Sequence, residues 1–294
     1  DYRTLVREYA KNRQEYKKVQ HQIPLMDMFL QFQAEAAAEH TRHLGQLAED
    51  VAGHPVLLST NAGLPNKTHT YVVKYLTHVV CEVGQNASAG TSRIDHAIEA
   101  YELAARLGKP MAATASGQDW AFAKQNNCED LVRFWIALAY AYGQRFMVPH
   151  PQRQWCFSNE LGTHWYAAPV EAYAPLYRFV RENAGWFDGF EAVESQRPMP
   201  AVPENVLATI RKKSGSNQVV LHLLNRDYDP ATKRVKALSN VELSLDRARV
   251  SPTKPYARLL SYDKPPQQVD LVQEAAALRV RIPELRLWTL VVLE

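Results

Sequence analysis

Thr77-His-Val-Val-Cys-Glu-Val83 and Met111-Ala-Ala-Thr-Ala115 are two short apolar runs, and the segment between them carries its apolar residues at helical spacing. A run that is apolar almost without interruption is typical of a strand buried on both faces. Residues 55 to 63 predict a similar strand before these two, and Arg145-Phe-Met-Val148 predicts one after them. Strand and helix thus alternate over residues 25–187, which predicts crossover units that build a parallel sheet.

The pattern changes after Met199. Seven short runs follow, separated by Pro, Gly, Asn and Asp turns, and most have no helix between them. This pattern predicts an antiparallel β-sandwich. We therefore expect an α/β chain with a parallel-sheet portion over residues 1–197, which carries the active site, and a β-sandwich domain over residues 198–294. The predicted strands of that domain are 206–210, 218–224, 241–245, 257–262, 267–271, 278–282 and 287–293.

Composition excludes several classes of function. The 294 residues carry a net charge of only +3 without blocks of like sign, so we expect no nucleic-acid partner. No apolar run reaches the roughly 18 residues that span a bilayer, so no membrane partner is expected. Cys81, Cys128 and Cys156 lie far apart without metal-ligand spacing, and we expect no disulfide framework, no metal and no cofactor. The compartment stays open.

The carboxyl ends of parallel strands meet at one edge of a sheet, where the loops are free to vary. Amides, carboxylates and indoles gather at these predicted ends. Amides bind hydroxyl groups, and flat indoles stack on the C–H face of a sugar ring, so we infer a carbohydrate substrate. The candidate substrate-binding residues are Asn61, Gln85, Asn86, Gln118, Asp119, Trp120, His150, Trp155 and Glu160.

Glu82 is the candidate catalytic residue, because it ends an otherwise apolar strand. A partly desolvated carboxyl group at that position is suited to act as a general acid. The alternative is that Glu82 faces outward or pairs with a nearby Arg or Lys.

The other candidates also have structural alternatives. Asp119 follows Gly117-Gln118 and is equally suited to cap a loop. Trp120 and Trp155 fall in predicted loops at the rim of the site, where we expect them to stack on sugar rings. His150 in Val-Pro-His-Pro either orients a substrate or completes a turn.

Several short phrases resemble the second half of a (β/α)8-barrel glycoside hydrolase. They are Ser-Thr-Asn61, the strand ending in Glu82, Gly108-Lys-Pro-Met-Ala-Ala-Thr-Ala115 and Tyr177-Arg-Phe-Val-Arg-Glu-Asn183. The later phrases Val219-Val-Leu-His-Leu-Leu-Asn225 and Ile282-Pro-Glu-Leu-Arg-Leu-Trp-Thr-Leu290 are similar to the β-sandwich that follows the barrel in dextranases and cyclodextran-forming glucanotransferases. Galactosidase-like clan members share this plan. The resemblance implies a barrel portion over residues 1–197 and Glu82 as general acid/base.

The chain departs from that pattern in one respect. Only helical material precedes residue 55, so about four strands of an eight-stranded barrel, including the one that would bear the partner carboxylate, lie outside it. Either a separate or missing N-terminal segment supplies them, or Asp119 is the second carboxylate, or a half-barrel only binds. We favour the first, because a half-barrel leaves unpaired strand edges. Residues 55–61 should then form an edge that another segment covers.

These observations predict a glycoside hydrolase or transglycosidase that cleaves oligo- or polysaccharide with two carboxylates. The alternative is a non-catalytic carbohydrate-binding or scaffold protein.

Overall fold

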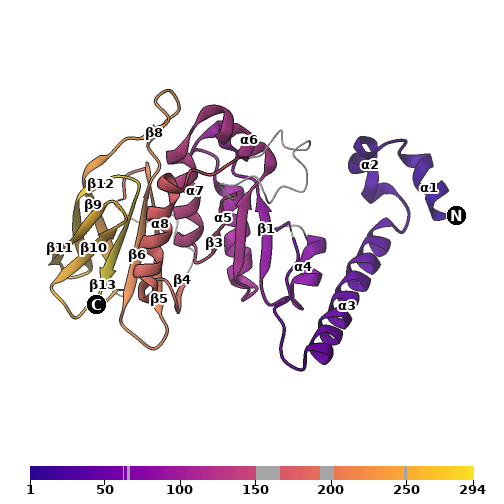
Figure 1. The fold of residues 1–294 in the computed structure, drawn as a ribbon, viewed down its shortest axis with the longest axis horizontal. Helices are drawn as coiled ribbons and strands as arrows, with labels where there is room; N and C mark the ends of the chain where they lie inside the picture. The colour runs from indigo at the N-terminus through magenta and orange to yellow at the C-terminus, as the bar shows by residue number, and fades with distance from the viewer. Residues whose placement is uncertain (62, 65–66, 150–165, 193–201, 248–249) are drawn as a thin grey trace.

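The computed structural model describes residues 1–61, 63–64, 67–149, 166–192, 202–247 and 250–294. Figure 1 shows three parts in a row: N-terminal helices, a small parallel sheet with its helices, and a large antiparallel sheet. The chain is therefore mixed α/β, with the parallel and antiparallel sheets in the expected order.

The N-terminal part consists of helices, and residues typical of helix caps mark where these helices begin and end. The sequence predicts one surface helix over 2–20, but the structure divides it, because Ala10 is extended and the Asn12 side chain accepts hydrogen bonds from two amides of a new helix. The long third helix ends at Gly53, whose left-handed φ of 71° suits a helix C-terminus. The helices of this part are α1 (Tyr2–Tyr9), α2 (Arg13–Val19), η1 (Gln20–Gln22) and α3 (Met26–Ala52).

The parallel sheet confirms the predicted alternation of strand and helix. Its three strands, β1 (Val79–Val83), β2 (Met111–Ala115) and β3 (Arg145–Phe146), pair in the order β1-β2-β3, and both pairs are parallel. The helices around it are α4 (Lys67–Val73), η2 (Ala87–Ala89), α5 (Asp95–Arg106), α6 (Gly117–Asn126), α7 (Glu129–Ala141), α8 (Val170–Glu182) and η4 (Ala184–Trp186).

The described residues of the strand predicted over residues 55–63 do not form a strand. Among them only Asn61 makes a parallel bridge, to Val80, and the backbone amide and carbonyl of Leu58 form hydrogen bonds with the hydroxyl and amide of Thr77. The segment therefore runs beside β1 without a ladder. Its apolar side chains are only partly buried: Leu58 packs against the core of the parallel sheet, whereas Leu57 is 84% exposed.

The two faces of the parallel sheet differ in burial. Val79, Cys81 and Val83 of β1 are buried in one core with α5 and α7. The intervening residues of β1 point to the other face, where Val80 is half-buried and Glu82 is exposed. A parallel sheet normally has both faces covered. In the described part of the chain, only one face of this sheet has such a cover.

The C-terminal sheet contains all seven strands predicted from the sequence, and β4 joins them. They form one eight-stranded sheet in the order β4-β5-β6-β13-β10-β11-β12-β9, which curls into a half-barrel around its own apolar core. The expectation of two separate sheets is thus corrected, because pairing of β10 with β11 continues the ladder between the two halves. Its strands are β4 (Phe190–Ala192), β5 (Val206–Lys213), β6 (Val219–Asn225), β9 (Leu238–Asp246), β10 (Tyr256–Ser261), β11 (Lys264–Gln273), β12 (Ala277–Leu285) and β13 (Trp288–Leu293).

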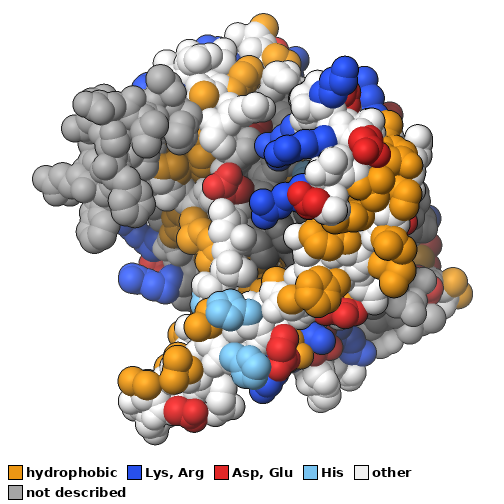
Figure 2. Space-filling view, turned by 90° about the vertical axis from the view of Figure 1, so that its right-hand side faces the viewer, with side chains coloured by type: hydrophobic (Ala, Val, Ile, Leu, Met, Phe, Trp, Pro, Cys, Tyr) orange, Lys and Arg blue, Asp and Glu red, His pale blue; other side chains and the backbone are white. Residues whose placement is uncertain are grey.

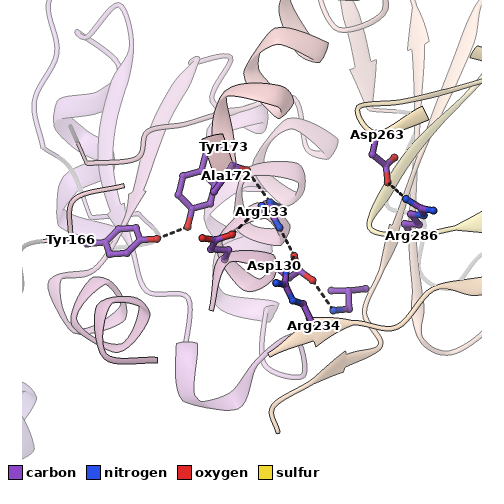
Figure 3. A network of polar contacts seen from close by, with 10 residues as sticks. Asp130, Arg133, Tyr166, Ala172, Tyr173, Arg234, Asp263 and Arg286 are labelled. Atoms are coloured by element: carbon purple, nitrogen blue, oxygen red, sulfur yellow. Dashed lines mark hydrogen bonds and ion pairs between the residues drawn. The ribbon is translucent and has the colours of Figure 1, made fainter. Parts of the chain in front are cut away.

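Polar contacts connect this part to the helices (Figure 3). The Asp130 carboxylate of α7 accepts hydrogen bonds from Arg133 at 2.6 Å and from the Val235 amide at 3.1 Å. Val235 belongs to β8 (Arg234–Val235), which forms a separate two-stranded sheet with β7 (Tyr228–Asp229). Arg133 in turn donates to the Ala172 carbonyl of α8 at 2.9 Å. Helix α7 is thus held on both sides. The boundary expected between residues 197 and 198 lies outside the described residues and stays a prediction.

His222 predicts a pH dependence of stability. It is fully buried against Trp288, at 5.9 Å between ring centroids, and neither ring nitrogen has a hydrogen-bond partner among the described residues. Burial, and then the charge of Arg211, hold its pKa well below the usual value. The unfolded chain binds a proton there below about pH 6.5 and the folded chain does not, so acid favours unfolding.

We expect the His222 contribution to the free energy of unfolding to fall by up to about 1.4 kcal/mol per pH unit below about pH 6.5. Urea unfolding at pH 7.5, 6.0 and 5.0 measures this, and His222→Leu should show a shallower slope than the wild type. His43→Gln, at an exposed position of α3, should keep the wild-type slope. Equal slopes in the wild type and His222→Leu would contradict the prediction.

Candidate functional site

The Asp119 carboxylate forms hydrogen bonds with residues that follow β1 and with one that follows β2. Ser116 directly follows β2 and is the N-cap of α6, and its hydroxyl donates to Asp119 Oδ2 at 2.6 Å. Asp119 Oδ2 also accepts from the Gln85 amide at 2.8 Å, and Oδ1 accepts from the Ala87 amide at 2.9 Å. The predicted convergence of the two loops is therefore observed, and a buried carboxylate holds it.

Glu82 lies near the carboxyl end of β1, on the sheet face opposite the core that β1 shares with α5 and α7. Its register partner is Thr114, so the two side chains share this face. Thr114 Oγ1 accepts a hydrogen bond from the Trp120 indole at 3.2 Å. Glu82 is exposed, so the desolvation expected from its apolar neighbours does not occur. The neighbouring apolar residues alternate to the opposite face.

Trp120 lies in helix α6, so its expected position in a loop is wrong. The indole is 5% exposed and stacks on Tyr166, with 5.3 Å between centroids and 10° between planes. Trp135 packs edge-on at 5.8 Å. One face of the indole is thus already covered by protein. Its role in stacking on a sugar stays a prediction.

The remaining candidates divide into exposed and enclosed amides. Gln85 is fully buried, and its Nε2 donates to the Val83 carbonyl at 3.1 Å. Asn86 is exposed, takes a left-handed φ of 52°, and donates to the Arg93 carbonyl at 3.2 Å. Asn61 and Gln118 are also exposed. Three further candidates, His150, Trp155 and Glu160, lie outside the described residues.

An open pocket of about 640 Å³ lies beside the loop that follows β1. Thr91 and Arg226 line this pocket and hydrogen-bond to each other. The Thr91 hydroxyl donates to the Arg226 carbonyl at 2.6 Å, and the Arg226 guanidinium donates to the Thr91 carbonyl. Tyr228, whose pKa burial raises to about 12, lines it together with Glu204 and Asn205. The sequence gives no signal for these residues, since Arg226 is 135 positions from Thr91.

The described residues contain no group of three or more His, Cys, Asp and Glu side chains arranged to hold a metal ion. No described helix is both long enough and apolar enough to cross a membrane. Cys81 and Cys128 are free and buried, and burial raises the pKa of both thiols.

No family model matches the sequence, and no curated protein is detectably similar to it. Among solved structures, the chain is similar to the glycoside hydrolase family 30 subfamily 8 xylanase Xyn30A from Clostridium acetobutylicum, with 13% identity over 89% of this chain and 72% of that one and a TM-score of 0.40. It is also similar to the catalytic domain of GH30 xylanase C from Talaromyces cellulolyticus, with 12% sequence identity and a TM-score of 0.41. That match covers 89% of this chain and 57% of the xylanase domain.

A third similar structure is α-L-fucosidase isoenzyme 2 from Paenibacillus thiaminolyticus, with 16% identity and a TM-score of 0.25. The match covers 40% of this chain and 17% of the fucosidase. The three structures give a distant resemblance to glycoside hydrolases and to no specific family. At these TM-scores the resemblance assigns neither a fold nor an activity to the chain.

Proposed function

We propose that this chain is part of a glycoside hydrolase or transglycosidase acting on oligo- or polysaccharide, with Glu82 as proton donor. The observation that carries the proposal is the position of Glu82. Its exposed carboxyl group lies near the carboxyl end of a parallel strand, on the face without helices. In a (β/α)8 barrel that face is the interior, and its carboxyl end carries the catalytic residues. The short phrases that resemble the second half of such a barrel support the same assignment.

In the proposed reaction Glu82 protonates the leaving-group oxygen as the glycosidic bond breaks through an oxocarbenium-like transition state. Exposed Asn61, Asn86 and Gln118 are proposed to bind hydroxyl groups, together with His150. Trp155 is proposed to stack on a ring face, and Glu160 is proposed as a further substrate contact. A second carboxylate must lie about 5 Å from Glu82 for retention or about 6.5–9.5 Å for inversion. Asp119 fits that role poorly, because Ser116 and two amides already occupy its oxygens.

We therefore propose that another segment, built of strands and helices, completes the barrel and supplies this carboxylate. An apolar surface along α3 and residues 55–61 supports the proposal. Figure 2 looks at this side of the molecule and shows hydrophobic side chains gathered there. Burying such a surface against a partner segment is favourable, and exposed patches of this kind mark interaction sites. Its exposed apolar members are Leu25, Met28, Phe29, Phe32, Leu44, Leu47, Val51 and Leu57.

Glu82→Gln tests the proton-donor role in the full-length protein. We expect a loss on the order of a hundredfold with glycosides that have poor leaving groups, and a much smaller loss with activated aryl glycosides, which need no proton. Steady-state kinetics with both substrate types measure the difference. Glu99→Gln, an exposed position on α5, is the matched control. Wild-type activity of Glu82→Gln with both substrates would remove Glu82 from the mechanism.

A non-catalytic carbohydrate-binding protein is the second candidate. The exposure of Glu82 favours it, because an exposed carboxyl group lacks the desolvation that suits a general acid. Binding of unhydrolysed oligosaccharide, with no cleavage and equal affinity in Glu82→Gln, would support this candidate.

A further inference from the structure

A second open pocket, of about 650 Å³, lies at the opposite end of the parallel sheet from Glu82. The residues that precede β2 and β3 form one wall, and β4 and β5 of the antiparallel sheet form the other. Neither the proposed sugar chemistry nor any predicted site residue uses this pocket. Its charged members are Arg106, Lys109, Arg145, Arg211, Asp188 and Glu191, an excess of two positive charges.

Arg211 of β5 is the unusual member of this group. The side chain is buried, with the residue only 9% exposed, yet no carboxylate lies within ion-pair distance among the described residues. Nη2 donates to the Phe190 carbonyl, and Nε is buried without any hydrogen-bond partner. Burial, and then the nearby charge of Arg145, lower the Arg211 pKa to about 10. A buried charge without a partner is costly, so this guanidinium is suited to take an anion.

The backbone at Gly143, in the turn before β3, lies close against the Arg211 guanidinium. Gly143 has a φ of 75°, and a Cβ atom there would clash with Arg211 Nη2. Only glycine allows the turn before β3 to approach the guanidinium this closely. Arg145, two residues further along, reaches the same pocket and pairs with Asp188 at 3.0 Å. Asp188 is thus paired with Arg145, and Glu191, the other carboxylate of the pocket, forms no ion pair with Arg211 in the described part of the chain.

We propose that this pocket binds a phosphate group between Arg211 and Arg145. Guanidinium groups bind phosphate oxygens through two parallel N–H donors, and two of them from different elements suit a tetrahedral dianion. A phosphate monoester carries about −1.5 to −2 charges at pH 7, which matches the excess of two positive charges better than one carboxylate does. The group can come from free phosphate or from a phosphorylated sugar.

Isothermal titration calorimetry of the full chain at low salt tests the site, with inorganic phosphate, glucose 6-phosphate, glucose and acetate as separate titrants. We expect saturable binding of one or both phosphate compounds and none of glucose. Tighter binding of glucose 6-phosphate than of inorganic phosphate identifies a phosphorylated sugar as the source, and the reverse order identifies free phosphate. Arg145→Gln, at a half-exposed position, and Arg211→Lys should each weaken binding at least about tenfold.

Arg279→Gln is the matched control, because it removes an exposed arginine of β12 that pairs with Glu274 and lies several strands away from β5 in the antiparallel sheet. It should bind phosphate as the wild type does. Three results would overturn the proposal: no saturable binding of either phosphate compound to the wild type, equal weakening by Arg279→Gln, or binding of acetate as tight as that of phosphate. Circular dichroism of each variant confirms that it is folded. If Arg211→Lys does not fold, Arg145→Gln alone decides the outcome.

Discussion

Trp288→Ala is expected to lower the free energy of unfolding by about 3–5 kcal/mol, the usual loss when a large buried aromatic side chain is deleted. Trp288 of β13 is fully buried and is surrounded by rings from both halves of the molecule. Phe179 lies at 5.4 Å, Phe187 at 5.8 Å and Tyr140 at 6.3 Å between centroids. Deletion therefore opens a cavity between the antiparallel sheet and helices α7 and α8.

Urea unfolding followed by tryptophan fluorescence and circular dichroism measures this loss. Because the cluster joins both parts, the two signals should shift together. Val272→Ala, at an exposed apolar position on β11, is the control and should change stability by less than about 0.5 kcal/mol. A loss for Trp288→Ala as small as that of the control would show that the cluster does not hold the two parts together.

Regular patterning explains why much of the fold is predictable from the sequence. The buried residues of β12 alternate as Leu278, Val280 and Ile282, and this period of two is visible in the sequence. In β1, the apolar run of residues 79–83 shows the strand but not which face of it is covered. Burial of the second face depends on segments elsewhere, which is why the exposure of Glu82 could not be predicted.

Two errors have separate physical causes. Residues 55–63 are apolar enough for a buried strand, but the Thr77 hydroxyl and amide bond to the backbone of Leu58, and an apolar composition does not encode that competing contact. Trp120 is predicted in a loop because it follows the predicted end of the strand at Ala115, at the rim of the expected site. Ser116-Gly-Gln-Asp119 also matches the capping pattern of a helix N-terminus, and that signal would have placed Trp120 in a helix.

The candidate site was only partly accessible to sequence reasoning. The meeting of Gln85 and Asp119 follows from parallel topology, since strand ends gather at one edge. The pocket between Thr91 and Arg226 depends on how the curled sheet docks on the helices, and no local pattern encodes that docking. Sequence patterns thus identify elements and their order, whereas contacts between distant elements require the structure.

Asp119→Ala is expected to lower the free energy of unfolding by about 3 kcal/mol, because it leaves two amide donors and a serine hydroxyl without their acceptor. The Gln85 and Ala87 amides are in buried surroundings, so lost hydrogen bonds are poorly replaced by water. Urea unfolding measures the global loss. Hydrogen exchange at these two amides should also become faster than in the wild type, because the carboxylate is the contact that holds the loop.

Asp119→Asn keeps the shape of the side chain and one carbonyl acceptor, so its loss should be smaller than that of Asp119→Ala. Asp270→Ala, at an exposed position of β11, should change neither the unfolding curve nor the exchange rates. The decisive comparison is between the two Asp119 variants. If Asn and Ala destabilise the chain equally, the carboxylate charge matters more than its acceptor geometry, and its assignment as a structural tie between β1 and β2 is wrong. If the graded loss is found, Asp119 acts as a structural residue through the Gln85–Ala87 loop, which agrees with the proposal that its carboxylate is not the second catalytic group.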